Sequence, residues 1–138
     1  MTAHFVALPF NRRKTVVAER WFAKGAGVKF DCRSAEGILV AAVDGRVDES
    51  TWEAFAESMS GAIDQAASEK LSEVMLDLTK LDYMSSRGLR VLTMAKRQAD
   101  GAGLTLTLAA PNEVMREILA ISRYDKLFHI SDSVDTGQ

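Results

Sequence analysis

The sequence predicts a single α/β domain with a mixed, mostly parallel sheet of four to five strands packed against three to four helices. Three observations lead to this fold class. Apolar stretches of strand length alternate with segments of helical period. Strands that alternate with helices need crossover connections, so the later strands are expected to run parallel. Two strands joined by a short turn come first, which makes the sheet mixed.

Composition limits the kind of protein. The 138 residues suit one hydrophobic core, and 47% apolar with 26% charged residues is ordinary for a soluble globular domain. No apolar run approaches the roughly 20 residues that a membrane helix needs. The N-terminus lacks the layout of a signal peptide, and the single cysteine, Cys32, cannot form an internal disulfide. We therefore expect a cytoplasmic protein that does not bind membranes.

Charge is distributed unevenly along the chain. Residues 1–25 carry a net charge of +4, which leaves −6 for the rest because the whole chain carries −2. We expect residues 1–26 to be a basic extension that is partly disordered, residues 27–132 to be the domain, and residues 133–138 to be a polar tail. Direct nucleic-acid binding is not expected, because the acidic domain would repel phosphate backbones.

The first two expected strands span residues 28–32 and 38–43. The first alternates apolar and polar residues, as a half-buried strand does. The second is a continuous apolar run, which is typical of burial on both faces. Residues 34–37 form the turn between them, and the segment Asp44-Gly45-Arg46-Val47-Asp48 is then expected to leave the sheet.

The clearest helix begins at Ser50. Ser50 and Glu53 are spaced as a capping box, in which the two side chains satisfy backbone N–H groups of the first turn. Apolar residues then recur at helical spacing and are expected to face the core: Trp52, Phe55, Ala56, Met59, Ile63, Ala66 and Ala67.

A third strand over residues 74–78 is expected to end in a polar loop that closes on Ser85 and Ser86, where the second helix starts. The remaining elements are a strand over residues 104–108, a helix after Pro111 and a short last strand or turn within residues 126–130.

Ser85 and Ser86 allow two interpretations. Serine is a preferred helix cap, so either residue could have a purely structural role. A helix N-terminus also presents free N–H groups and a dipole that favours negative charge, which suits a phosphorylated serine. Arg87 and Arg90 follow at once and could hold a phosphate.

Acidic residues surround the same stretch. Asp77 and Asp82 flank the expected loop, and Asp44 and Asp48 follow the second strand. Because functional loops gather at the carboxyl ends of parallel strands, these acids could share a face with Ser86 or be plain solvated charge. A phosphate of about −1.5 to −2 charges placed beside them would be repelled and would change the binding surface.

Enzyme chemistry lacks a recognisable set of residues. There is no G-x-G-x-x-G or P-loop pattern, and Met84-Ser85-Ser86-Arg87-Gly88 is not a G-x-S-x-G elbow. His4 and His129 are far apart in the chain and have no clear partner for catalysis or metal binding. We therefore expect no enzyme activity, no cofactor and no metal; a small serine hydrolase acting through Ser86 is the remote alternative.

A family resemblance adds to these patterns. Residues 77–92, D-L-T-K-L-D-Y-M-S-S-R-G-L-R-V-L, resemble the strand end, serine loop and G-L-x-x-L helix start of the STAS domain of anti-sigma-factor antagonists. Residues 43–48 are similar to the G-x-[LIV]-D turn of that family. Residues 104–110, the helix after Pro111 and residues 124–130 are similar to its C-terminal third. The resemblance covers residues 28–132 and implies a STAS-type fold.

The resemblance also implies a partner switch. In such proteins the unphosphorylated form binds an anti-sigma factor that is also a GHKL-type serine kinase, and thereby frees the sigma factor. Phosphorylation of the loop serine releases the partner, and a PP2C-type phosphatase restores the binding form. By position, the phosphoacceptor falls on Ser86, with Ser85 as the second candidate.

The residues expected to meet the partner come from the two matching segments: Asp44, Arg46, Asp48, Thr79, Asp82, Met84, Ser85, Arg87 and Arg90. A weak homodimer is a further expectation. Two positions depart from the family pattern, since Ser85 stands where an Asp is frequent and Arg87 where a small residue is usual. The alternative function is a STAS interaction subunit without phosphorylation, for instance in a lipid-transport complex.

Overall fold

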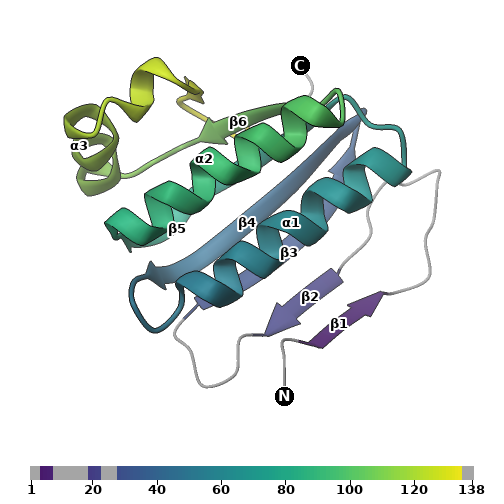
Figure 1. Ribbon diagram of the computed structural model, residues 1–138, viewed down its shortest axis with the longest axis horizontal. Helices are drawn as coiled ribbons and strands as arrows, with labels where there is room; N and C mark the ends of the chain where they lie inside the picture. The colour runs from purple at the N-terminus through teal and green to yellow at the C-terminus, as the bar shows by residue number, and fades with distance from the viewer. Residues whose placement is uncertain (1–3, 8–18, 23–27, 135–138) are drawn as a thin grey trace.

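The computed structural model describes residues 4–7, 19–22 and 28–134 (Figure 1). In these ranges the strands form one sheet in the order β1-β2-β3-β4-β5-β6-β7. The elements, in chain order, are β1 (His4–Ala7), β2 (Glu19–Phe22), β3 (Val28–Ala35), β4 (Ile38–Val47), α1 (Trp52–Ser68), β5 (Glu73–Met84), α2 (Ser86–Gly101), β6 (Thr105–Ala109), α3 (Glu113–Ile121), the 3-10 helix η1 (Tyr124–Lys126) and β7 (His129–Ser131).

The predicted fold class is confirmed. Strands β3 and β4 pair antiparallel, whereas the neighbouring pairs β4–β5, β5–β6 and β6–β7 are parallel. These five strands give the expected mixed and mostly parallel sheet. The parallel pairs are joined by α1, α2 and α3, as crossover connections require.

Two N-terminal strands extend the sheet beyond this arrangement. β2 pairs antiparallel with β3, and β1 pairs antiparallel with β2. The sheet therefore continues across the boundary predicted between residues 26 and 27. The exposed edge of β3 would otherwise leave a row of backbone N–H and C=O groups unpaired. Residues 1–26 were predicted to be partly disordered. Apart from β1 and β2, these residues lie outside the described ranges.

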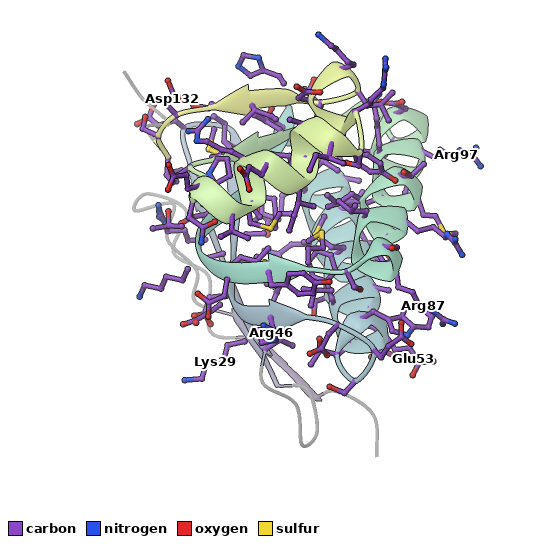
Figure 2. All side chains as sticks on the ribbon, turned by 90° about the vertical axis from the view of Figure 1, so that its left-hand side faces the viewer. Lys29, Arg46, Glu53, Arg87, Arg97 and Asp132 are labelled. Carbon is purple, nitrogen blue, oxygen red and sulfur yellow. The ribbon has the colours of Figure 1, made fainter. Side chains whose placement is uncertain are left out.

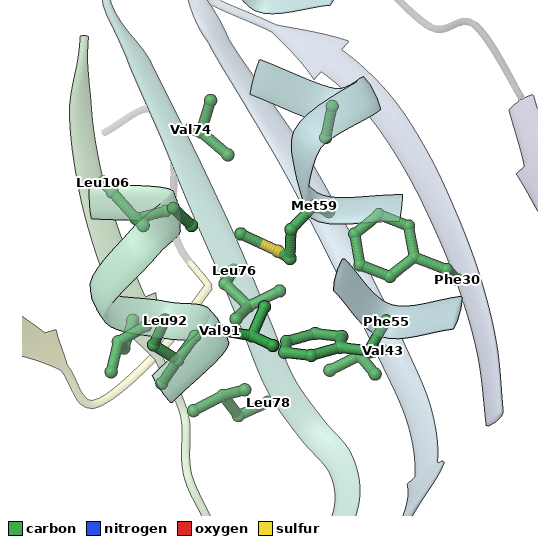
Figure 3. Packing of buried hydrophobic residues seen from close by; sticks show 14 of the residues in the cluster. Phe30, Val43, Phe55, Met59, Val74, Leu76, Leu78, Val91, Leu92 and Leu106 are labelled. Carbon is green, nitrogen blue, oxygen red and sulfur yellow. The ribbon is translucent and has the colours of Figure 1, made fainter. Parts of the chain in front are cut away.

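Helices α1 and α2 lie side by side on one face of the sheet (Figure 1). The alternate residues of each strand that face them form the core, with Phe30, Leu76 and Leu78 at 2% exposure or less. Phe30 meets Phe55 of α1 edge to face at 6.3 Å between ring centroids, and Met59 packs into the same cluster (Figure 3). The expectation that the α1 apolar stripe faces the core is confirmed for Phe55, Met59, Ile63 and Ala66, and Trp52 and Ala56 pack against the core partly buried. Ala67 is exposed, so the prediction was wrong for this residue.

Three strands are longer than predicted. β3 continues to Ala35, so Ser34 and Ala35 belong to the strand and not to the predicted turn. β4 continues to Val47 and β5 to Met84, so the segment 44–48 does not leave the sheet at Asp44 and residues 79–83 are not a loop. Strands β4 and β5 remain paired through Val47 and Met84, with register shifts on the way. Polar residues made this stretch look like a loop, although Leu81 keeps its place in the core at 0% exposure.

The opposite face of the sheet carries a smaller apolar cluster. Val40, Met75 and Ala109 are buried there, and Val134 packs against them after β7. Towards β3 this open face becomes polar. Of the helices that the structure describes, none combines the length and apolar character needed to cross a membrane.

Candidate functional site

The junction between β5 and α2 separates the roles of the two serines. Ser85 is the N-cap of α2, with extended backbone, and its hydroxyl oxygen accepts a hydrogen bond from the Gly88 N–H at 3.4 Å. Ser86 is the first residue of the helix and is exposed. Its hydroxyl makes no hydrogen bond with any residue in the described ranges. Ser85 thus has the structural role, and Ser86 presents a free hydroxyl.

Neighbouring backbone holds this junction in place. The Ser85 N–H donates to the Val47 carbonyl at 2.8 Å, and the Leu89 N–H donates to the Ser85 carbonyl at 2.9 Å. The first N–H groups of a helix have no acceptor within the helix. Those beside Ser86 can therefore stabilise negative charge together with the helix dipole.

Gly88 allows α2 to approach the strands closely. A Cβ atom at this position would lie 2.4 Å from Met84 Cγ and 2.7 Å from Val47 Cγ1. Met84 itself is only 1% exposed. The prediction that Met84 contacts a partner is therefore wrong for the structure described. Because β5 continues to Met84, its side chain is buried beneath the start of α2 and supports the site from the core.

The preceding strand-to-helix turn, between β4 and α1, lies next to the first. Thr51, 2% exposed, donates its hydroxyl hydrogen to the Arg46 carbonyl at 2.8 Å and accepts from the Asp48 N–H at 2.8 Å. Asp48 Oδ1 accepts from the Ser50 N–H at 3.0 Å and from its hydroxyl at 2.9 Å.

These bonds correct the predicted capping box. Thr51, not Ser50, is the N-cap residue of α1, and its side chain makes no capping bond to the helix. Ser50 instead binds Asp48. Hydrogen bonds from the Ser50 hydroxyl and the Ser50 backbone N–H hold the pKa of the Asp48 carboxyl below its ordinary value, and Arg46 adds to the effect.

Arg87 connects the two turns. Its Nε lies 3.5 Å from Glu49 Oε2, and its guanidinium carbon lies 5.0 Å from the centroid of the Trp52 ring. Figure 2 shows Arg87 on the same side of the molecule as Glu53 of α1. Neither Glu49 nor the contact of Trp52 with Arg87 was predicted from the sequence. The predicted topology could have indicated this contact, because the carboxyl ends of adjacent parallel strands meet at one edge of the sheet and bring the two turns together.

Arg46 belongs to a second small cluster. Its guanidinium carbon lies 4.7 Å from the centroid of the Tyr83 ring, and its Nε lies 3.4 Å from Asp48 Oδ2. Arg46 is exposed, as are Arg87 and Arg90 on the start of α2. Arg87 and Arg90 therefore place exposed positive charge within about one helical turn of Ser86.

The remaining predicted contact residues lie elsewhere on the sheet. Asp44 and Thr79 line a shallow cavity of about 210 Å³ on the open face, together with Asp31, Asp77 and Lys80. Asp31, Asp44 and Asp77 each alternate with core residues along their strands and so point away from α1 and α2. Asp82 is exposed near the end of β5. The hypothesis that Asp44 and Asp77 share a face with Ser86 is not supported by this arrangement.

The histidines are also separated from Ser86. His129 lies in β7, two strands beyond β5 in the sheet, and His4 lies in β1 at the far edge. His129 makes no hydrogen bond to Ser86 in the described structure. The geometry is that of an exposed hydroxyl at a helix N-terminus, with cations nearby.

Comparison with known proteins agrees with this fold. The STAS domain family matches residues 29–137. A relative from Bordetella bronchiseptica, named "Putative anti-sigma factor antagonist BtrV", is 28% identical over 106 residues, which cover 77% of this chain and 88% of that protein. The chain therefore belongs to the STAS domain family.

Solved structures show the same fold. An anti-sigma factor antagonist from Mycobacterium paratuberculosis superposes with a TM-score of 0.64 at 19% identity, covering 78% of this chain and 88% of that one. The anti-sigma factor antagonist SpoIIAA in its unphosphorylated form gives 0.59 at 18% identity, with coverage of 73% and 86%. The phosphorylated form of Bacillus SpoIIAA gives 0.53 at 19% identity, with coverage of 73% and 89%.

Proposed function

We propose that this STAS protein is an anti-sigma-factor antagonist whose partner binding is switched by phosphorylation of Ser86. In its unphosphorylated form it binds an anti-sigma factor that is also a GHKL-type serine kinase, and so frees the sigma factor. The phosphorylated form releases that partner, and a PP2C-type phosphatase reverses the modification. The protein itself catalyses no step.

The observation that carries the proposal is that Ser85 and Ser86 have different roles in the structure. Capping occupies the Ser85 hydroxyl, which accepts from the Gly88 N–H. Ser86 is exposed one residue later and its hydroxyl is unused within the described structure. A kinase can therefore modify Ser86 without removing the cap that begins α2.

Local charge explains how a phosphate would act there. Added to Ser86, it would carry about −1.5 to −2 charges next to the N-terminus of α2, which favours negative charge. Arg87 is adjacent and currently contacts Glu49 at 3.5 Å. Phosphate would attract this guanidinium and repel the Glu49 carboxylate, so the charge pattern that a partner meets would change.

The relatives support the same function. The Bordetella protein carries the name of an anti-sigma factor antagonist, and SpoIIAA has been solved in unphosphorylated and phosphorylated forms. The proposed partner-contact surface consists of the exposed residues Arg46, Ser86, Arg87 and Arg90 and the half-buried residues Asp48 and Ser85 around the two turns. Asp44, Thr79 and Asp82 are proposed as contacts only for a partner that also reaches the open face or the end of β5.

The test is the affinity of the cognate anti-sigma factor kinase for charge variants, measured by calorimetry. Ser86→Asp is expected to weaken binding at least about tenfold, which corresponds to about 1.4 kcal/mol. Ser86→Ala should bind like the wild type and stay bound when ATP is added. Ser68→Asp places the same charge at the C-terminus of α1, at the opposite end of the helices from Ser86, and should leave the affinity unchanged.

Equal affinities for Ser86→Ala and Ser86→Asp would contradict the proposal. Stable binding of both variants would instead fit an interaction subunit that does not use phosphorylation. Covalent labelling of Ser86 by a fluorophosphonate probe would point to a hydrolase.

A further inference from the structure

An apolar groove runs between α1 and α2 on the outer surface of the helical layer. It has a volume of about 460 Å³ and is lined by Trp52, Ala56, Met59, Ser60, Val91, Met94, Ala95 and Gln98. Met94 is 64% exposed and lines the groove together with other apolar side chains, so the apolar surface is not a single isolated residue. The groove therefore presents apolar surface that nothing in the described structure covers.

Acidic residues line the α1 side of this groove, which we call the acidic wall: Glu53, Glu57 and Asp64. Glu53 and Glu57 each follow a groove residue by one position. One residue is a rotation of about 100° on a helix of 3.6 residues per turn. All three carboxylates are exposed. They stand on the outer side of α1, next to the apolar floor.

Basic residues line the α2 side, which we call the basic wall: Arg87, Arg90 and Arg97. Arg90 and Arg97 each precede a groove residue by one position, and Arg87 lies one turn before Val91. All three are exposed. Figure 2 shows Arg87, Arg97 and Glu53 on the helical side of the molecule and Lys29 on the other side.

Most of these charges have no ionic partner among the described residues. In the part of the chain that the structure describes, Glu53, Glu57, Arg90 and Arg97 make no ion pair. Two walls of opposite charge therefore face solvent along the same groove, without neutralising each other across it. A surface of this kind fits a partner with the opposite order of charges.

The walls are in register along the groove. Arg87 contacts the Trp52 ring at one end, and at the other end Gln98 donates to Ser60 O at 3.2 Å and to Asp64 Oδ1 at 3.1 Å. The two helices run in the same direction, because each follows one of two parallel strands (Figure 1). Glu53 is therefore at the level of Arg87 and Arg90, and Asp64 is at the level of Arg97.

We infer that the groove is the contact surface of a homodimer whose two-fold axis runs parallel to α1 and α2. Such an axis places α1 of one copy over α2 of the other and preserves the level of each residue along the helices. The acidic wall of each copy then meets the basic wall of its partner, so this contact occurs twice in the dimer, with Met94 and Trp52 between the walls. Closed two-fold dimers are the commonest assembly of soluble proteins.

A second copy is favoured because the chain itself supplies the required pattern. An axis across the groove would instead place acidic wall over acidic wall and basic wall over basic wall, and like charges in contact are costly. The charge order thus selects one orientation of the dimer. The inference does not depend on phosphorylation of Ser86.

Sedimentation equilibrium of the full chain over a concentration series tests the dimer. The wild type is expected to show a reversible monomer–dimer equilibrium that weakens as salt is added, since exposed charge contacts are screened. Glu53→Lys with Glu57→Lys, and separately Arg90→Glu with Arg97→Glu, should each reduce the association constant at least about tenfold.

The decisive sample is an equimolar mixture of these two double variants. In the mixed dimer the reversed acidic wall of one variant meets the reversed basic wall of the other, and the remaining normal basic wall meets the normal acidic wall, so both contacts become attractive. Dimer should therefore reappear in the mixture. Lys29→Glu with Arg33→Glu makes the same charge change on the open face of β3 and should leave the equilibrium as in the wild type.

A wild-type protein that stays monomeric at protein concentrations up to about 1 mM would overturn the inference. A dissociation constant of about 1 mM corresponds to a binding free energy of about 4 kcal/mol. So would a mixture that remains monomeric, or reversed variants that still dimerise. If the protein is monomeric and the reversed variants lose the anti-sigma factor kinase instead, the groove belongs to that partner and the dimer is rejected.

Discussion

The two strand-to-helix turns at the carboxyl edge of the sheet follow adjacent parallel strands, yet they use their hydroxyl groups differently. Thr51, between β4 and α1, is buried and its hydroxyl makes two bonds of 2.8 Å to backbone groups. Ser86, the first residue of α2, is exposed and its hydroxyl is unbonded in the described structure. One turn therefore uses its hydroxyl to fix the backbone, and the other leaves its hydroxyl accessible.

Ser85 makes this difference possible. It satisfies the helix start by accepting from the Gly88 N–H, and its own N–H binds the carbonyl of Val47 at the end of β4. The first turn thus supports the second. A modifiable residue can be exposed at a helix terminus when a neighbour supplies the structural bonds.

The largest expected effect on stability comes from the buried hydroxyl. Thr51→Val keeps the shape but leaves the Asp48 N–H and the Arg46 carbonyl without their partner. We expect the free energy of unfolding to fall by about 2–3 kcal/mol, since an unsatisfied buried group costs about 1–3 kcal/mol. Urea unfolding measures the change. Thr51→Ser is the control, and an equal loss in both variants would show that the hydroxyl is not responsible.

The contact between the two turns is tested at Gly88. A Cβ there would lie 2.4 Å from Met84 Cγ. We expect Gly88→Ala to lower the free energy of unfolding by up to about 2 kcal/mol, because overpacking costs about 1–3 kcal/mol and the gain in helix propensity returns only about 1 kcal/mol. The matched variant Gly101→Ala, which meets nothing within 4 Å, should be neutral or stabilising. Equal behaviour of both variants would contradict the close approach of α2 to Val47 and Met84.

The two serines should differ in unfolding experiments as well. Ser85→Ala removes the cap and should cost about 1 kcal/mol. Ser86→Ala removes only an exposed hydroxyl and should change the free energy of unfolding by less than about 0.5 kcal/mol. Thermal or urea unfolding of the two single variants measures this. A larger loss for Ser86→Ala would reverse the roles assigned here.

The smallest effect is expected at Asp48. Its folded-state pKa is lowered by bonds from Ser50, so it contributes stability above the ordinary carboxyl pKa of about 3.9, and this contribution is lost as pH falls through the folded value. Asp48→Asn should therefore be less stable than the wild type at pH 7, with a difference that shrinks in acid. A difference that is constant between pH 7 and pH 2 would exclude the ionised carboxylate as its source.

The sequence predicted the fold class and the position of Ser86 because both depend on local patterns. Periodicity identified the buried strands and α1, and two serines after a strand indicated a helix start. The ends of β4 and β5 were missed because the polar residues around Asp44 and Thr79 face the open side of the sheet and resemble a loop. Their place in strands depends on pairing between segments that are distant in the sequence.

The details of the site depend on tertiary contacts. Which serine caps α2 is set by the bond from Ser85 N–H to Val47, and the contact of Arg87 with Glu49 and Trp52 joins two turns that are remote in the chain. Tertiary contacts also explain why Thr51, and not Ser50, is the N-cap residue of α1. The Thr51 hydroxyl binds the Arg46 carbonyl, and this bond depends on the extension of β4 to Val47.

The site of phosphorylation tests the central claim most directly. Wild type, Ser85→Ala and Ser86→Ala would each be incubated with the cognate kinase and ATP, and the peptides carrying both positions would be sequenced by tandem mass spectrometry. We predict one phosphate on Ser86 in the wild type and in Ser85→Ala, and none in Ser86→Ala. Phosphate on Ser85, or an unmodified wild-type protein that the kinase nevertheless binds, would contradict the account.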